Sequence, residues 1–419
     1  MSRGLGDVYQ RQPKGYKKTE VGVIPEEWDV LDIDHITDKV GSGITPSGGS
    51  LVYSTNGHPF IRSQNVGWGN FIMDDIVYIN DHIHKKQLST EVKWGDILLN
   101  ITGASIGRSS VVLRDDLIGG NVNQHVCIIR LCDQYDSKFV NINILSNLVQ
   151  NQIKAFQAGG NREGLNFSQV RVIKMPFPPS SERQAITEVL SDMDALIEAQ
   201  KKLIAKKRDI KQGTMQYLLS GRVRLPGYET KGWKHTDIGD IPDDWVVKKL
   251  GDISDLYQPK TISQNEMHDS GPYLVYGANG IIGRYHEYNH KESEIMITCR
   301  GNTCGTINIS SPYAWITGNA MVVRIQNKEF IDNKFISYFL KYTSQILGSI
   351  TGGAQPQITR EPLKKLWIYC PRFSEQQAIA QVLSDMDNEI ETLEAELEKL
   401  NHMKRGMMQE LLTGRIRLI

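Results

Sequence analysis

Two blocks of this sequence occur twice, and this duplication restricts the fold more than any other feature. The segment TEVGVIPEEW at 19–28 returns as TDIGDIPDDW at 236–245. A longer block also returns with unchanged spacing, in three pieces: ERQAI and VLSDMD within 182–194 match EQQAI and VLSDMD within 375–387, and LLSGRVRL at 218–225 matches LLTGRIRL at 411–418. The segments between these blocks are not alike. The pattern predicts alternating globular parts and helices, in which the helices share one task and the globular parts recognise different things.

The longer duplicated block predicts a long helix in each copy. Serines just before each block are typical N-caps, and Gly221 and Gly414 are typical helix terminators. The roughly 39 residues between these signals contain no proline, so each helix would run for about 58 Å. Apolar residues recur at spacings of three and four, as in a coiled coil. We therefore expect long helix 1 at 181–221 and long helix 2 at 374–419.

The charges of the two helices favour antiparallel packing of one on the other. The late part of long helix 1 is basic and the early part of long helix 2 is acidic, so antiparallel packing places opposite charges side by side. Two solvated charged faces are the alternative interpretation. Long helix 1 also has a second apolar row, which needs a further partner. The residues that we assign to partner docking are Val189, Leu196, Leu203, Ile210, Leu393, Leu400 and Met407.

The sequence between the helices indicates the α+β class. Short apolar runs alternate with Gly, Asn, Asp and Ser turns, which is typical of short strands, and helical patterns occur at 138–156 and 329–347. We predict a mixed, mainly antiparallel sheet or partial barrel with small helices in each globular part. The expected division is an N-terminal extension at 1–19, a first globular domain at 20–180, long helix 1 at 181–221, a linker at 222–236, a second globular domain at 237–373 and long helix 2 at 374–419.

Several loops of the globular domains are rich in groups that read nucleic acid. Asn and Gln hydrogen-bond adenine edges, Arg binds guanine, and glycine lets the backbone approach phosphate. The alternative is that Gly- and Asn-rich loops are only turns. The candidate DNA-contacting residues are Thr45, Ser47, Arg62, Gln64, Asn65, Ser105, Arg108, Asn123, Gln124, Asn279, Arg300, Asn302, Gln355 and Gln357.

Composition and missing motifs argue against several classes of protein. Five scattered cysteines without a C-x-x-C pair argue against a disulfide framework or a metal site and favour a reducing cytoplasm. No apolar run reaches the ~20 residues that a membrane span requires. The sequence has no P-loop and no Asn/Asp-Pro-Pro-aromatic tetrapeptide of an amino-methyltransferase. The acidic turn at 243–244 repeats the turn at 26–27, which argues against a nuclease site. We expect no catalytic residue, metal or cofactor in this chain.

In their duplicated order, these motifs resemble the specificity (S) subunit of type I restriction–modification systems. The resemblance rests on the paired Ile-Pro-acid-acid-Trp turns, the paired helix starts and the paired Leu-Leu-Ser/Thr-Gly-Arg segments. It implies that each globular domain is a target-recognition domain that reads one half of a bipartite double-stranded DNA site. It also implies that the long helices set the spacing and dock two methyltransferase (M) subunits, which carry S-adenosylmethionine and methylate adenine. Restriction (R) subunits with ATP and magnesium would join in a system that cleaves DNA.

Two alternatives from other classes stay open at this point. A single-chain DNA methyltransferase or nuclease needs a cofactor motif, and a coiled-coil scaffold leaves the polar loops without a task.

Lys+Arg 48 and Asp+Glu 48 give a formal net charge of zero, which is unusual for a DNA-binding chain. We therefore expect weak, salt-sensitive DNA binding by the chain alone and much tighter binding together with M subunits.

Overall fold

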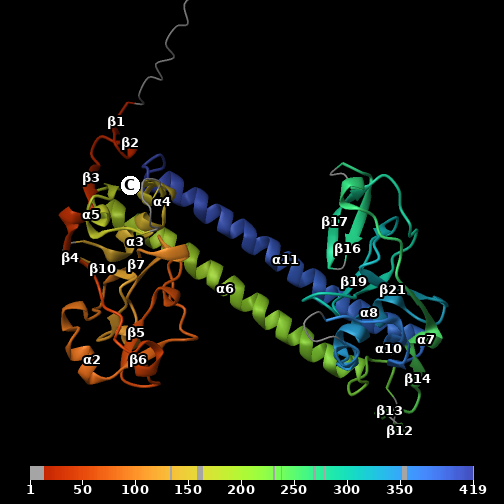
Figure 1. The fold of residues 1–419 in the computed structure, drawn as a ribbon. Coiled ribbons are helices and arrows are strands. Elements are labelled where there is room, and N and C mark those ends of the chain that lie inside the picture. Colours follow the sequence, from red (N-terminus) through yellow and green to blue (C-terminus); the bar gives the residue numbers. More distant parts are fainter. Residues whose placement is uncertain are drawn as a thin grey trace, which may run out of the picture. The chain divides into compact units, whose positions relative to one another are not determined.

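The computed structural model describes residues 14–132, 135–157, 164–229, 232–236, 238–267, 270–277, 279–351 and 356–418. The chain divides into two compact units. Unit 1 comprises Met1–Ala199 with Leu397–Ile419, and unit 2 comprises Gln200–Glu396. Each unit therefore holds one globular domain and a part of both long helices, α6 (Ser180–Leu219) and α11 (Phe373–Leu411) (Figure 1).

Unit 1 is organised around a four-stranded antiparallel sheet in the order β4-β10-β7-β8. A three-stranded sheet (β6-β5-β9) and the pairs β1-β2 and β11-β3 accompany it. The strands are β1 (Tyr16–Thr19), β2 (Gly22–Pro25), β3 (Asp29–Asp32), β4 (Thr37–Ser42), β5 (His58–Ile61), β6 (Val77–Ile79), β7 (Ile97–Asn100), β8 (Ser109–Val111), β9 (Asn121–Val122), β10 (Val126–Leu131) and β11 (Lys174–Phe177). The helices beside α6 are α1 (Ile33–Ile36), α2 (Asp81–Lys85), α3 (Ser137–Leu145), α4 (Asn147–Gln157) and α5 (Phe167–Arg171).

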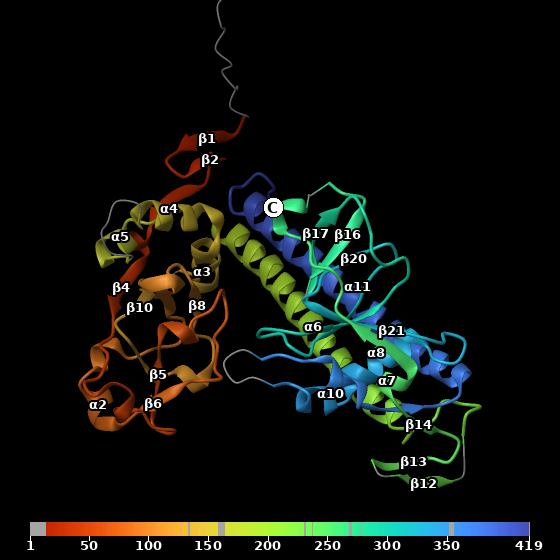
Figure 2. The ribbon, with the colours of Figure 1, turned by 45° about the vertical axis from the view of Figure 1, so that its right-hand side comes forward.

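Unit 2 repeats this arrangement with different side chains. Its four-stranded sheet has the order β15-β21-β18-β19, and a three-stranded sheet has the order β17-β16-β20 (Figure 2). The strands are β12 (Trp233–Thr236), β13 (Gly239–Pro242), β14 (Val246–Lys249), β15 (Ser254–Tyr257), β16 (Tyr273–Gly277), β17 (Gly280–Tyr285), β18 (Ile295–Thr298), β19 (Ile307–Ile309), β20 (Trp315–Ile316), β21 (Ala320–Ile325) and β22 (Trp367–Cys370). The short helices are α7 (Leu250–Ile253), α8 (Asn333–Tyr342), α9 (Gln345–Gly348) and α10 (Arg360–Lys364).

The central strands have apolar residues on both faces because each four-stranded sheet lies between two hydrophobic layers. In β7, Ile97 and Leu99 belong to the core that contains Trp28, whereas Leu98 belongs to a second core on the opposite face. Successive strand side chains point to opposite faces, so a fully apolar run is what a sheet covered on both sides requires. The pairings β5-β9 and β16-β20 are parallel, and the other strand pairings in both units are antiparallel. The predicted mixed, mainly antiparallel α+β class is confirmed.

The two long helices pack against each other in antiparallel fashion within each unit. In unit 2, Lys207 pairs with Glu389 at 2.5 Å, Arg208 pairs with Glu394, and Lys211 pairs with Asp387. In unit 1, Lys404 of α11 pairs with Asp194 of α6 at 2.5 Å. Gln200 bonds Glu396, whereas Lys211, eleven residues later in α6, pairs with Asp387, nine residues earlier in α11, so the predicted antiparallel coiled coil is confirmed.

The inner faces of the helices join the cores of the globular domains. Ile186 and Leu190 of α6 and Leu411 and Leu412 of α11 are buried in the core of unit 1. Residues 215–219 of α6 and the start of α11 make the equivalent contribution to unit 2. Among the described helices, none combines the length and apolar character that crossing a lipid bilayer requires.

Candidate nucleic-acid interface

Three loops of unit 1 meet at one edge of its four-stranded sheet. We define loop cluster 1 as residues 43–48 after β4, 101–108 between β7 and β8, and 123–125 between β9 and β10. The backbone N–H of Ile101 donates to the carbonyl of His125 at 3.0 Å. A Cβ on Gly43 would lie 1.7 Å from the carbonyl oxygen of Val122, so only glycine lets the first loop lie this close to β9.

Three loops of unit 2 meet in the same way. We define loop cluster 2 as residues 259–263 after β15, 299–306 between β18 and β19, and 317–319 between β20 and β21. Here the N–H of Cys299 donates to the carbonyl of Asn319 at 3.2 Å. A Cβ on Gly318 would lie 2.7 Å from the carbonyl oxygen of Pro259, so this contact also depends on glycine.

The longest loops of the two clusters share one backbone design. The backbone N–H of Gly107 donates to the backbone carbonyl of Asn100 at 3.0 Å, and that of Gly305 donates to the backbone carbonyl of Thr298 at 2.9 Å. Both loops contain a glycine with positive φ at the same step, 71° in loop cluster 1 and 84° in loop cluster 2. These bonds align the two loops residue by residue.

The aligned side chains of these loops differ in chemistry. The pairs are Thr102 with Arg300, Ala104 with Asn302, Arg108 with Thr306, and His125 with Asn319. Neither unit relies on these side chains for its core. The arrangement therefore suits two ligand surfaces that have the same shape and different hydrogen-bonding patterns.

The candidate residues of loop cluster 1 are only partly accessible. Ser47 and Gln124 are exposed, while Thr45, Ser105 and Arg108 are half-buried. Asn123 is buried, and its side-chain oxygen accepts from the N–H of His125 at 3.1 Å.

The segment 62–65 lies beside loop cluster 1 and is held by Asp75. Arg62 donates to the carbonyl of Asp75 at 2.6 Å, and Gln64 donates to the Asp75 carboxylate. Asn65 is fully buried. Its side-chain nitrogen donates to the carbonyl of Ile72 and to the Asp75 carboxylate, and its side-chain oxygen accepts from the N–H of Arg62, at 3.0 Å each. The burial of Asn65 corrects its assignment as a base-contacting residue, because its polar atoms are already used inside the protein.

The candidate residues of unit 2 are the more exposed set. Arg300 and Asn302 are exposed on the loop between β18 and β19, and Gln357 is exposed and pairs with Arg300 through a backbone bridge. Asn279 is exposed at the turn between β16 and β17. Gln355 lies outside the described residues.

Sequence reasoning missed the loop at 259–263. Its residues Lys260 and Ser263 are exposed in loop cluster 2, next to the loop that carries Arg300. A comparison of the two copies could have found this loop, because the loop 259–263 follows β15 as the loop 43–48 follows β4 in the first copy. No motif in the loop itself indicates a binding role.

The docking candidates on the long helices differ in exposure. Leu196 (49 % exposed), Leu203 (39 %) and Ile210 (46 %) lie on an open face of α6. Leu393 and Leu400 of α11 are half-buried. The remaining candidates, Val189 and Met407, pack against the core of unit 1.

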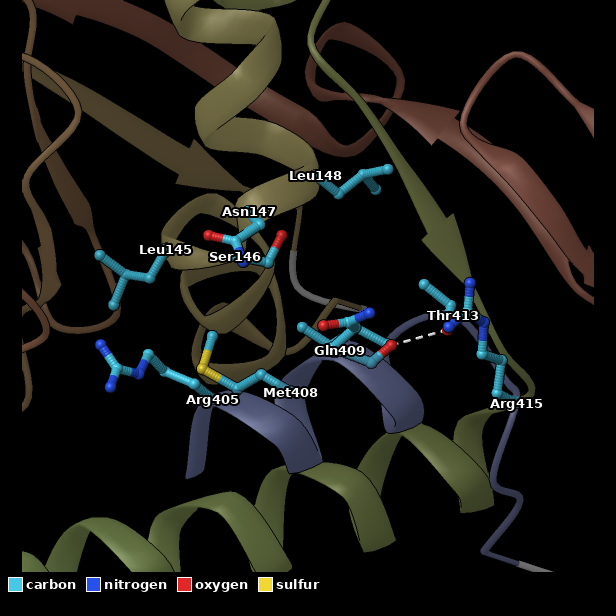
Figure 3. A pocket seen from close by; sticks show the side chains of 10 residues that line it. Leu145, Ser146, Asn147, Leu148, Arg405, Met408, Gln409, Thr413 and Arg415 are labelled. Carbon is cyan, nitrogen blue, oxygen red and sulfur yellow. Dashed lines mark hydrogen bonds between the residues drawn. The ribbon is translucent and has the colours of Figure 1, made fainter. Parts of the chain in front are cut away.

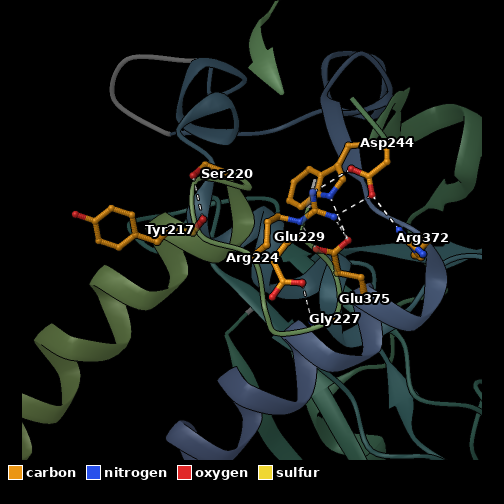
Figure 4. A network of polar contacts seen from close by, with 9 residues as sticks. Tyr217, Ser220, Arg224, Gly227, Glu229, Asp244, Arg372 and Glu375 are labelled. Carbon is orange, nitrogen blue, oxygen red and sulfur yellow. Dashed lines mark hydrogen bonds and ion pairs between the residues drawn. The ribbon is translucent and has the colours of Figure 1, made fainter. Parts of the chain in front are cut away.

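The duplicated motifs meet in a buried polar network at the end of the helix pair in each unit. In unit 2, Arg224 donates two hydrogen bonds to Glu375, at 2.6 and 2.7 Å, and two to Asp244, at 3.0 Å each (Figure 4). The indole N–H of Trp245 donates to the same Glu375 at 3.3 Å. The hydrogen bond from Arg224 holds the pKa of Asp244 below its usual range. Asp244 therefore has a structural role.

The network of unit 1 has the same design. Arg417 donates to Glu182 at 2.6 and 2.8 Å and pairs with Glu27 at 2.7 Å, and Trp28 donates to Glu182 at 3.0 Å. Burial opposes ionisation of Glu182, but the hydrogen bonds from Arg417 and Trp28 outweigh it and lower the pKa of this carboxyl. We refer to these two sets as the anchor networks, because each ties the entry turn of a globular domain to the start of one long helix and the end of the other.

The described residues form a pocket in unit 1 but no metal-binding cluster. Within the described ranges, no group of three or more His, Cys, Asp or Glu side chains is placed to hold a metal ion. A pocket of about 390 Å³ lies between the α3–α4 corner and the end of α11 in unit 1 (Figure 3). Its polar lining consists of arginines, amides and hydroxyls, and contains no carboxylate, histidine or cysteine.

Comparison with known proteins places the chain in a family. The family model described as type I restriction modification DNA specificity domain matches residues 25–206 and 242–402, so the chain belongs to this family. The MjaX specificity subunit of a type I restriction enzyme from Methanocaldococcus jannaschii is 28 % identical over 425 residues, which cover 97 % of each chain. The EcoKI specificity subunit from Escherichia coli is 24 % identical over 261 residues, 60 % of this chain and 53 % of that protein.

Solved structures agree with this assignment at the level of the fold. The S subunit of a type I restriction–modification system from M. genitalium matches with a TM-score of 0.58 and 18 % identity, covering 92 % of this chain and 96 % of its own. A chain from a study of complex assembly and conformational transition of the type I R-M system matches with a TM-score of 0.55 and 16 % identity, covering 94 % and 99 %. The predicted family and fold class are thus confirmed.

Proposed function

We propose that this chain is the DNA-specificity subunit of a type I restriction–modification complex. Loop cluster 1 reads one half of a bipartite DNA site and loop cluster 2 reads the other. The chain itself performs no chemistry. Two M subunits with S-adenosylmethionine methylate adenine, and R subunits with ATP and magnesium join where the system cleaves DNA, in the cytoplasm.

The observation that carries this proposal is the pairing of one loop backbone with two sets of side chains. A common backbone positions both loops in the same way against a regular duplex, and different side chains then select different bases. Family membership supports DNA as the ligand. The exposed guanidinium of Arg300 and amide of Asn302 are suited to base edges in the major groove.

The neutral net charge supports a role for partner subunits in binding DNA. Much of the affinity of DNA-binding proteins comes from neutralising phosphates with lysine and arginine. A chain with 48 basic and 48 acidic residues supplies little of this on its own. We expect the M subunits to contribute most of the phosphate contacts, so that affinity rises steeply when they are present.

A loop exchange tests the proposal. Replacing residues 300–306 by the sequence TGASIGR of 102–108 should preserve the fold, because the two loops share their backbone hydrogen bonds. Methylome sequencing of a host that carries the variant with its M subunit should show a changed or lost second half-site and an unchanged first half-site. The control is Arg284→Ala, which removes an exposed arginine of unit 2 outside loop cluster 2. An unchanged methylated sequence after the loop exchange would refute base reading by this loop.

A further inference from the structure

An exposed arginine and an exposed β-branched aliphatic residue follow the end of each long helix. In unit 2, Arg222 and Val223 follow the last turn of α6, and Val223 is 50 % exposed. In unit 1, Arg415 and Ile416 follow the last turn of α11, and Ile416 is 54 % exposed. We define the helix-end knuckles as residues 220–223 and 413–416. Each presents a guanidinium next to a β-branched aliphatic side chain.

The backbone of both knuckles is held in one conformation. Gly221 and Gly414 have φ of 72° and 68°, a left-handed conformation that glycine adopts without strain. The N–H of Val223 donates to the carbonyl of Tyr217, and the N–H of Ile416 donates to that of Glu410, at 3.3 Å each. These bonds join residues six positions apart. The N–H groups of Gly221 and Gly414 also donate to the carbonyls of Leu218 and Leu411 at 3.2 Å each, which is the shorter of the two bonds of a Schellman motif.

The anchor networks fix each knuckle from the other side. Arg224 and Arg417 lie two residues beyond the exposed arginines and are bonded to Glu375 and Glu182 respectively. The two exposed pairs are therefore presented in the same local geometry, each by its own unit.

The fold explains the repetition of the buried residues but not that of the exposed ones. Leu218, Leu219 and Gly221 repeat because they pack in the core or turn the chain. Arg222 is exposed and makes no ion pair with any described residue, and Arg415 makes only a solvent-exposed contact of 3.5 Å with Glu410. A task that both copies perform accounts for the repetition of these arginines and of their aliphatic neighbours.

The exposed apolar row of α6 is not repeated in α11. The residues of α11 that correspond to Leu203 and Ile210 are Glu396 and Met403, and the residue that corresponds to Tyr217 is Glu410. Two identical partners that bind equivalent surfaces cannot both use an apolar row that occurs once. This argues for the knuckles as the repeated contact.

We propose that each helix-end knuckle is the docking contact of one methyltransferase subunit. The contact on the partner is a carboxylate that pairs with the knuckle arginine, beside an apolar side chain that packs on Val223 or Ile416. The proposal rests on the proposed function, because it takes the methyltransferase as the partner. It adds where each copy binds and what chemistry it presents.

The pocket of unit 1 lies next to its knuckle and matches this chemistry. Arg415 and Thr413 of the knuckle line it together with Arg405, and the apolar side chains of Leu145, Leu148 and Met408 form much of its surface (Figure 3). Arg405 corresponds to Gln212 in unit 2, so the knuckle arginine is the charge that both copies share. In unit 1, two guanidinium groups around an apolar surface favour an acidic and apolar segment of a partner.

The number of bound partners tests the proposal directly. The complex of the full chain with its own M subunit is purified and weighed by native mass spectrometry, and wild type should carry two M subunits. The variants Arg222→Glu with Val223→Ser, and Arg415→Glu with Ile416→Ser, should each carry one, since the affinity of the altered site falls by at least ~30-fold. The four substitutions together should leave no M subunit bound.

Control variants separate docking from folding and from other surfaces. Arg222→Lys with Val223→Ile keeps the positive charge and a β-branched aliphatic side chain and should retain two M subunits. Lys291→Glu, on an exposed site of unit 2, should also retain two. Leu203→Ser with Ile210→Ser removes two apolar side chains that the sequence assigned to partner docking, so it tests that assignment against the knuckles, which predict two bound M subunits. Thermal unfolding of each variant checks the fold.

The outcomes distinguish the two proposals. Wild type without any M subunit overturns the proposed function and this inference together. Wild type with two M subunits and knuckle variants that also keep two overturn only this inference. Loss of partners from the apolar-row variant with intact binding by the knuckle variants overturns it as well.

Discussion

Removing Arg224 should destabilise unit 2 more than any other single change to an ion pair. Glu375, its partner, is fully buried, and only 8 % of the Arg224 side chain is exposed. The substitution Arg224→Met keeps most of the side-chain volume but leaves a buried carboxylate without its cation. Breaking a buried pair in this way costs about 3–5 kcal/mol.

The geometry of the anchor networks also predicts how the cost differs between the two units. Arg417 is 21 % exposed and Glu182 is 5 % exposed, so solvent screens this pair more strongly. Arg417→Met should therefore cost less than Arg224→Met. The double variant Arg224→Met with Glu375→Leu should recover most of the lost stability, because it removes both charges from the buried site.

Urea denaturation followed by tryptophan fluorescence measures these differences. Trp245 belongs to the network of unit 2 and Trp28 to that of unit 1, so each unit has an internal reporter. A loss below about 1 kcal/mol for Arg224→Met, or a double variant that is less stable than the single one, would refute the reasoning.

Three further perturbations test other parts of the structure. Burial, aided by the positive charge of Arg324, lowers the pKa of His290 to about 4 from its usual 6.5, so the unfolded chain binds the proton more readily. The contribution of His290 to the stability of unit 2 should be complete above pH 6.5 and should fall by about 3 kcal/mol by pH 4. In urea titrations, the free energy of unfolding of His290→Gln should therefore depend less on pH than that of wild type. Gly414→Ala places a Cβ 2.5 Å from Pro25 and should lower stability by about 2–4 kcal/mol. The control Gly227→Ala, at a φ of 87° with no atom within 4 Å of the added Cβ, should cost only about 1 kcal/mol. Equal losses of thermal stability would contradict a steric requirement for glycine at 414. Lys206→Glu with Lys207→Glu removes the pair to Glu389, which is 48 % exposed, and should cost about 1 kcal/mol at low salt and less at high salt; a loss that does not depend on salt would contradict an electrostatic contribution to the helix pair.

Much of the architecture could be predicted because the sequence repeats it. Heptad spacing and opposite charges were enough to predict two antiparallel helices, since both properties are local to the chain. The apolar runs around Leu98 and Ile128 predicted strands correctly. They could not indicate that alternate residues serve two separate cores, because that depends on a second sheet formed by distant residues.

Other features were beyond sequence reasoning for physical reasons. The helical pattern at 138–156 is divided into α3 and α4, because Ser146 leaves the helical conformation with ψ of 154°. The burial of Asn65 depends on Asp75, which a loop brings beside it. The anchor networks were visible as repeated motifs, but their contacts require the antiparallel helices to bring the end of one beside the start of the other.

Division of DNA reading between two independent target-recognition domains is the central claim. Exchange of residues 20–178 for the corresponding domain of another family member, followed by methylome sequencing of a host that carries the hybrid and its M subunit, tests it most directly. The account predicts a bipartite site in which one half changes and the other half keeps its sequence. A hybrid that alters both halves, or neither, while still supporting methylation would contradict it.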